Sequence, residues 1–369
     1  MKEKRKRSSV GKLLFLFSIA VAITLSLGIF ASYISPARFW APAFFGLLFL
    51  YVYPVNFLFI IYYALRRRKH IIVPLIPAVL GFTIFLHAVN FIPAAKQEHP
   101  EGIKVMSYNV RLFDLYNWSH NRETRAKIFN YLTEEAPDIA CFQEYYTEDS
   151  EAFRNTDTLV EILKTPYYQY NYTTHRVHNT RHWGIILFSK FPIINKGEIN
   201  FETKGSNTAT FADILVNKDT IRIYNAHLES IRFKKPDYEY VSDFKDNVEE
   251  KNWSGLRRIY NRLKNAFIKR AVETDQIAGH MKACNYPIIF CGDFNDPPSS
   301  YTYSCFSGFL KDAFKQGDAG FGATYNGPFP AFRIDYIMHS PAIKATSFKV
   351  VRNDLSDHCP VVAYLKIGE

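Results

Sequence analysis

The first hundred residues and the rest of the chain differ in their pattern of apolar and polar positions. Residues 13–37, 39–65 and 71–95 contain no Lys, Arg, Asp or Glu. Each stretch is long enough to cross the roughly 30 Å hydrocarbon core of a bilayer, which takes about 20 apolar residues. We therefore expect a membrane region at 13–95 that follows a basic terminal segment at 1–12.

Transmembrane helices are expected at about 13–35, 39–65 and 71–93. The first stretch also resembles a cleaved secretory signal, because the basic run Lys2–Arg7 precedes it. A signal has an apolar core of only about 7 to 15 residues, and two further apolar stretches follow here at once. We therefore favour a retained anchor. The third stretch fits a transmembrane helix least well, because Pro74 and Pro77 lie near its start.

Beyond residue 103 the pattern changes to short apolar runs separated by polar segments, which is typical of alternating strands and helices. The expected strands are Ile103–Asn109, Asp138–Gln143, Gly184–Ser189, Thr208–Val216, Thr220–His227, Tyr286–Cys291, Ile334–Met338, Ala345–Val351 and Pro360–Leu365. Amphipathic helices are expected at Glu123–Glu135 and Leu256–Ala283. This content predicts an α+β domain over 103–367, with helices covering mixed β-sheets.

A polar, charged and aromatic insert at about 231–255 interrupts this order. Loops of that length are usually functional or disordered. The helix that follows carries many basic residues between its apolar ones, so it fits either an anionic membrane surface or an ordinary solvated basic face.

The positive charge of the chain belongs to the membrane region. Residues 1–100 carry 12 Lys and Arg against two acidic residues, and the remaining 33 basic and 33 acidic residues cancel. The basic residues cluster at Lys2–Arg7 and at Arg66–Lys69. Because such clusters stay on the cytoplasmic side, we expect a multi-pass protein of the cell (inner) membrane whose large domain is extracytoplasmic.

Polar residues follow or end several of the expected strands. In chain order they are Asn109, Glu144, His227, Asp293, Asn295, Asp335, Asp357 and His358. Singly, such residues more often cap turns or satisfy backbone groups than take part in catalysis. Together they are hard to explain as packing, because buried Asp, Glu and His are rare unless paired.

These side chains have the chemistry needed to hydrolyse a phosphodiester. Glu144 and Asp357, with Asn109 as a further ligand, suit Mg²⁺ or Mn²⁺, which prefers one or two carboxylates together with substrate oxygens. Proton transfer near neutral pH suits His227 and His358.

The remaining three residues would support these groups. Asp335 would fix the tautomer of the His358 imidazole. The Asp293 carboxylate is placed to orient or deprotonate the attacking water, and Asn295 would steady the phosphate.

The ordered motifs resemble the endonuclease/exonuclease/phosphatase superfamily over about residues 103–367. The matching stretches are Met106–Arg111, Phe142–Glu144, Gly184–Ile193, Gly292–Asn295, Arg333–Ile337 and Ser356–Val361. The resemblance implies a four-layer sandwich of two β-sheets flanked by helices, with Glu144 as the main metal ligand and Asp335 paired with His358. In the pattern of that superfamily, His227 would occupy the position that is histidine in the deoxyribonuclease I and sphingomyelinase branches but not in typical apurinic endonucleases.

The pattern also looks like membrane-anchored bacterial members of that superfamily. One departure is Arg111, which stands where repair enzymes often have an acidic residue, so the resemblance gives no support for a second metal there. The resemblance implies a membrane-anchored phosphohydrolase that acts on a nucleic acid, a phospholipid or a small phosphodiester or monoester.

The alternative is a catalytically idle membrane receptor or scaffold that binds phosphorylated ligands. We rank it lower, because no residue of the expected site is lost. The expected partners are the phosphoester substrate and the lipid bilayer, and the sequence identifies no protein partner.

Overall fold

The structure is a computed structural model that describes residues 9–93, 101–176, 180–203, 205–233, 236–237, 240, 253–317, 319–327 and 332–368. Most of the expected insert at 231–255 lies outside the described residues.

The amino-terminal region is helical, as its apolar stretches predict. Helices α1 (Ser9–Ala31) and α2 (Ala41–Leu65) are both long and apolar enough to cross a membrane. The stretch expected to span at 71–93 is broken into α3 (Ile72–Leu80) and α4 (Phe82–Ala88). The helical segments Lys69–Leu80 and Phe82–Ala88 are bent by 53° and together are long and apolar enough for a broken span or a re-entrant loop. Pro77 lies inside α3 and Gly81 at the break, and both residues weaken the helical hydrogen-bond pattern.

The carboxy-terminal domain contains two six-stranded mixed sheets. The first has the order β11-β12-β1-β2-β4-β3, from β1 (Ile103–Asn109), β2 (Ile139–Glu148), β3 (Tyr167–Arg176), β4 (Arg181–Ser189), β11 (Ile343–Val350) and β12 (Val361–Ile367). The second has the order β5-β6-β7-β8-β10-β9, from β5 (Ile193–Ile199), β6 (Thr208–Val216), β7 (Asp219–His227), β8 (Ile288–Asp293), β9 (Lys311–Asp312) and β10 (Asp335–His339).

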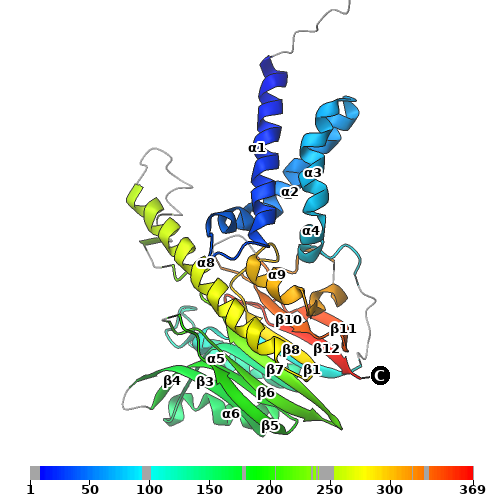
Figure 1. Ribbon diagram of the computed structural model, residues 1–369. Coiled ribbons are helices and arrows are strands. Elements are labelled where there is room, and N and C mark those ends of the chain that lie inside the picture. The colour runs from blue at the N-terminus through cyan, green and yellow to red at the C-terminus, as the bar shows by residue number, and fades with distance from the viewer. Residues whose placement is uncertain are drawn as a thin grey trace, which may run out of the picture.

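Helices cover the outer faces of both sheets (Figure 1). The first sheet packs against α5 (Thr124–Glu135) and α6 (Asn155–Leu163), and the second against α8 (Trp253–Lys282) and α9 (Tyr301–Ser307). Short 3-10 helices lie at Lys69–Ile71 (η1), Arg111–Asp114 (η2), Glu151–Phe153 (η3) and Ala313–Gln316 (η4). The expected four-layer α/β/β/α sandwich is confirmed.

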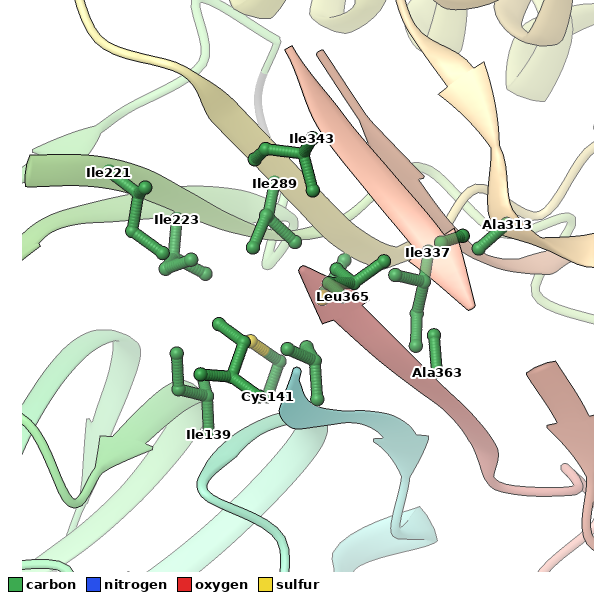
Figure 2. Close-up of a cluster of buried hydrophobic side chains, with 14 of the residues drawn as sticks. Ile139, Cys141, Ile221, Ile223, Ile289, Ala313, Ile337, Ile343, Ala363 and Leu365 are labelled. Atoms are coloured by element: carbon green, nitrogen blue, oxygen red, sulfur yellow. The ribbon is translucent and has the colours of Figure 1, made fainter. Parts of the chain in front are cut away.

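A continuous apolar core joins the inner faces of the two sheets. Figure 2 shows Ile139 and Cys141 of β2 on one side of this core, with Ile221 and Ile223 of β7 on the other. These side chains belong to alternate positions of their strands, as expected where one face of each sheet is buried. Cys141 is a buried free thiol in this core and behaves as a small apolar residue.

The helical region makes direct contacts with the sandwich. The Ser32 hydroxyl donates to the Ser299 carbonyl at 3.0 Å, and the Ser299 hydroxyl donates to the carbonyl of Gly46 in α2 at 2.8 Å. The Arg333 guanidinium donates to the carbonyl of His87 in α4 at 2.8 Å. The large domain is therefore joined to the end of the helical region where α1 ends and α2 begins.

Candidate active site

Three site residues lie side by side because of strand register in the second sheet. His227 of β7 pairs with Asp293 of β8, and Asp293 pairs with Asp335 of β10. Neighbouring strands lie about 4.8 Å apart, so this register brings the three side chains within reach of one another. The His227 Nε2 atom is 3.5 Å from Asp293 Oδ2.

His358 reaches the same row from the loop that precedes β12. Its Nδ1 atom is 3.0 Å from Asp335 Oδ2, and its Nε2 atom is 3.8 Å from Asp293 Oδ2. The Thr324 hydroxyl accepts the backbone N–H of Asp335 at 3.1 Å, and the ring of Tyr325 lies against that of His358. The expected pairing of Asp335 with His358 is present in the structure.

Burial and charge act in opposite directions on His358. Burial by itself lowers the pKa of the imidazole, but the carboxylates of Asp335 and Asp293 outweigh it and raise the pKa well above its ordinary value. Burial raises the pKa of Asp335, while His358 opposes that change. The two carboxylates therefore favour the protonated form of the His358 imidazole.

Asn109 joins the two sheets at this point. Its side-chain amide, at the end of β1, donates to Asp293 Oδ2 at 3.0 Å, and its Oδ1 atom accepts the backbone N–H of Arg111. The Ser356 hydroxyl donates to the Asn109 carbonyl at 2.9 Å and so fixes the loop that carries His358. The Asn109 amide thus supports Asp293.

Glu144 is directed into the site by an irregularity in β2. The β2–β4 register shifts between Phe142 and Tyr145, and Glu144 has a φ of 45° in the left-handed region. Such bulges re-aim side chains, and a non-glycine residue adopts this conformation only at some cost. The Glu144 carboxylate, about one-third exposed, lies 3.9 Å from His227 Nε2.

Asp357 and Asn295 are tied less closely to this cluster. Asp357 Oδ2 is 3.5 Å from the Arg111 guanidinium, which itself stacks over the ring of Trp118. Asn295 has a φ of 53°, and its side-chain amide donates to the Leu228 carbonyl at 3.1 Å. Its backbone N–H donates to Asp293 Oδ1, so its observed contacts position Asp293.

A buried polar link behind the site was not expected from the sequence. The Gln143 amide donates to Asn225 Oδ1 at 2.7 Å, which connects β2 of the first sheet to β7 of the second. The Asn225 amide donates in turn to the carbonyls of Phe142 and Ile186. The only indication of this link in the sequence is that Gln143 comes one position before Glu144 and Asn225 two positions before His227.

A cleft of about 320 Å³ opens beside Glu144 and His227. Its walls include Tyr116, Trp183 and Arg232, from loops and strands of both sheets. The Arg232 guanidinium donates to Asn207 Oδ1 at 2.9 Å. Aromatic rings and a guanidinium beside carboxylate and imidazole groups suit an anionic substrate.

The donor set fits a divalent cation. Ligand atoms of Asp293, Asp335 and His358 lie within 4.8 Å of one another, although these groups already serve as partners to each other. The Glu144 and Asp357 carboxylates instead reach solvent, as ligands of a hydrated ion must. Among the described residues, His227 Nε2 is buried without a hydrogen-bond partner, which fits a group bound in the cleft.

Family models match both parts of the chain. The endonuclease/exonuclease/phosphatase family model matches residues 106–358. Residues 11–88 match a domain of unknown function, DUF8431. No curated protein matches the chain.

Solved structures share the fold at low identity. An endonuclease/exonuclease/phosphatase from Beutenbergia cavernae is 16% identical, with a TM-score of 0.53 and 72% coverage of each chain. A family protein from Bacteroides thetaiotaomicron is 18% identical, with a TM-score of 0.51, and the match covers 73% of this chain and all of that one. The mannosyl-6-phosphatase Bt3783 of the same species is 19% identical, with a TM-score of 0.49 and coverage of 72% and 100%.

The family match includes the motifs that carry Asn109, Glu144, Asp293 and Asp335, and it ends at His358. It spans well over half of the chain, and the observed sandwich agrees with it. The chain therefore belongs to the endonuclease/exonuclease/phosphatase family.

Proposed function

We propose that this protein is a membrane-anchored, divalent-metal-dependent phosphoesterase whose catalytic domain is extracytoplasmic. The observation that carries the proposal is an unbroken series of close contacts across the two sheets. It runs from Glu144 through His227 and Asp293 to His358 and Asp335, with no step longer than 3.9 Å. Packing alone gives no reason to gather so many ionisable groups.

A divalent cation such as Mg²⁺ or Mn²⁺, held by Glu144 with Asn109 and Asp357, would offset the charge of the phosphoryl group. The Asp293 carboxylate would orient the attacking water and accept its proton. Its Oδ2 atom accepts from the Asn109 amide, which fixes the carboxylate in one orientation.

The two histidines would contact the phosphate. The cationic His358 ring would direct its Nε2–H at a phosphate oxygen, while Asp335 holds the proton on Nδ1. His227 Nε2 would bind another phosphate oxygen or protonate the leaving oxygen. Asn295, through its backbone contact with Asp293, would keep the base in position.

The proposed membrane topology is supported by the positions along α2 of its Lys and Arg cluster and of its contact with the large domain. The cluster Arg66–Lys69 follows the carboxyl end of α2, whereas Gly46, near its amino end, contacts the large domain. Clusters of Lys and Arg next to spans stay in the cytoplasm, so the catalytic domain would be on the opposite side. A reporter fused after Glu369 tests this: activity of a reporter that works only in the cytoplasm would overturn it.

Hydrolysis by the full-length protein in detergent tests the enzymatic proposal. The substrates are bis-(p-nitrophenyl) phosphate, p-nitrophenyl phosphate, linear DNA and RNA, sphingomyelin and phosphoinositides, each with Mg²⁺ or with EDTA. We expect turnover that needs the ion and disappears in Asp293→Ala.

His280→Gln is the matched control, because His280 contacts Tyr224 on the covered face of the second sheet and should leave the rate unchanged. An equal rate in Asp293→Ala would overturn the proposal. Tight binding of a phosphorylated ligand without turnover would favour the scaffold alternative.

A further inference from the structure

Helix α8 extends beyond the sheet that it covers. It has 30 residues, so it is about 45 Å long. Its later turns bury Phe267, Ala271, Ile277 and Met281. Its first turns project on the side of the sandwich where α1 and α2 stand (Figure 1).

The projecting turns carry large exposed apolar side chains. Trp253 is 72% exposed, Leu256 47% and Tyr260 37%. These positions follow the i, i+3, i+7 spacing of one helix face. Apolar side chains that lie together on one exposed helix face are typical of a surface that contacts a protein or a membrane.

The lower part of the same face already contacts the helical region. Tyr260 stacks on Phe44 of α2 at 5.2 Å and lies edge-on to Trp40 at 5.6 Å. The Lys264 ammonium lies 4.7 Å from the ring centre of Trp40. Trp253 and Leu256 continue this surface toward the first turn of α8.

The charged residues of these turns are all basic. Residues 253–270 contain six Lys and Arg residues and no Asp or Glu. Four of the six pair with acidic residues outside the helix: Arg258 and Arg262 with Asp237, Lys269 with Glu229, and Arg270 with Asp296. Arg257 is exposed beside Trp253 and Leu256. Aromatic residues mixed with Arg and Lys are typical of segments in the headgroup layer of a membrane, where anionic lipids attract the cations.

The opposite face of the same turns holds a wall of the catalytic cleft. Arg258 and Arg262 both pair with the buried carboxylate of Asp237. Arg262 also donates to the carbonyl of Arg232 at 2.9 Å, and Arg232 lines the cleft beside Glu144. One helix thus connects the exposed aromatic face to the substrate pocket.

We propose that the first turns of α8, with Trp253, Leu256 and Arg257, lie in the headgroup layer of an anionic bilayer. This inference rests on the proposed membrane anchoring of α1 and α2. Its consequence is that the Arg232 wall of the cleft is held at the membrane surface, so the enzyme meets its phosphoester substrate there.

Fluorescence quenching tests the position of α8 without any measurement of hydrolysis. The full-length protein is placed, one copy per disc, in nanodiscs of phosphatidylglycerol and phosphatidylcholine with acyl chains brominated near the headgroup. We expect bromine to quench part of the tryptophan emission and Trp253→Phe to remove part of that quenched emission. The difference should grow with the phosphatidylglycerol content.

The matched control moves the tryptophan along the same helix. Gly279 is exposed, and a side chain added there meets open space, so Trp253→Phe combined with Gly279→Trp should fold normally. Position 279 lies about 39 Å further along α8, and its emission should escape quenching.

Equal quenching at positions 253 and 279 would overturn the proposal. Absence of quenching at Trp253 would also overturn it, and this is the result expected if a second copy of the chain, rather than lipid, covers this face. A lack of response to phosphatidylglycerol would overturn the anionic-lipid assignment. Failure of the phosphoesterase proposal would leave the quenching unchanged, so the two failures are distinguishable.

Discussion

The candidate site has a buried side and an open side, which differ in the exposure of their residues. On the buried side, His358 lies between the carboxylates of Asp293 and Asp335, and all three side chains are buried. On the open side, Glu144 and Asp357 keep about a third of their side-chain surface exposed, and the Arg111 guanidinium lies 3.5 Å from Asp357 Oδ2. The buried side is arranged before any ligand arrives, whereas the open side leaves oxygen atoms available to a hydrated ion and a substrate.

This difference predicts that the two sides respond differently to substitution. Removing one partner of a buried ion pair costs about 3–5 kcal/mol, because the remaining charge loses its compensation. Removing a partly exposed carboxylate costs far less stability. Changes on the buried side should therefore affect both folding and turnover, and changes on the open side mainly affect ligand binding.

The largest effect is expected for His358→Ala. Loss of the cationic ring should lower turnover about 10²- to 10⁴-fold and lower the free energy of unfolding, because the Asp335 carboxylate is left buried alone. Steady-state rates and thermal unfolding of the full-length protein measure both effects. A variant that keeps the wild-type rate would remove His358 from the mechanism.

Glu144→Gln should act mainly on the ion. We expect the Mg²⁺ concentration needed for half-maximal activity to rise at least about tenfold, because even residues behind a metal ligand change affinity by that factor. The free energy of unfolding should change by no more than about 0.5 kcal/mol, since the side chain is partly exposed. Metal titration of the rate is the measurement, and an unchanged titration would exclude Glu144 as the main ligand.

The stability of the metal-free protein should depend on pH through His358. Its pKa in the folded state is raised above the unfolded value near 6.5, so its contribution is fully present below about pH 6.5 and is lost as the pH rises through the raised pKa. We expect the wild-type unfolding midpoint in EDTA to fall over that window and the midpoint of His358→Asn to fall less. If the unfolding midpoints of the wild type and of His358→Asn fell equally with pH, the pH dependence would not come from His358.

The sequence predicted the interior strands and the positions of the motifs more accurately than it predicted the edge strands of the two sheets. The expected strands Ile103–Asn109 and Thr208–Val216 agree with β1 and β6 residue for residue, because both are short, largely buried segments rich in apolar residues. The edge strands β3, β5 and β9 were not predicted. The sequence Tyr167–Arg176 is largely polar and aromatic, as an exposed edge permits.

The site was foreseen as a set of residues but not as a set of contacts. Spacing along a chain cannot give the register that aligns His227, Asp293 and Asp335, or the bulge that turns Glu144 into the cleft. The link between Gln143 and Asn225 also depends on how two sheets pack, which no local pattern encodes.

The buried hydrogen bond between Gln143 and Asn225 gives the smallest expected effect on turnover and tests how the two sheets are joined behind the site. Gln143 and Asn225 connect the strand of Glu144 to the strand of His227. Gln143→Leu should cost about 1–3 kcal/mol of unfolding free energy, because Asn225 Oδ1 loses its donor in the core.

The double variant with Asn225→Leu should cost less than the sum of the two single variants, because the shared hydrogen bond can be lost only once. Chemical denaturation of all four proteins measures this coupling. Turnover should fall only a few-fold in Gln143→Leu, since no catalytic group is removed. A fall as large as that of His358→Ala would mean that the sheet-to-sheet link, rather than the buried charges, sets the geometry of the cleft.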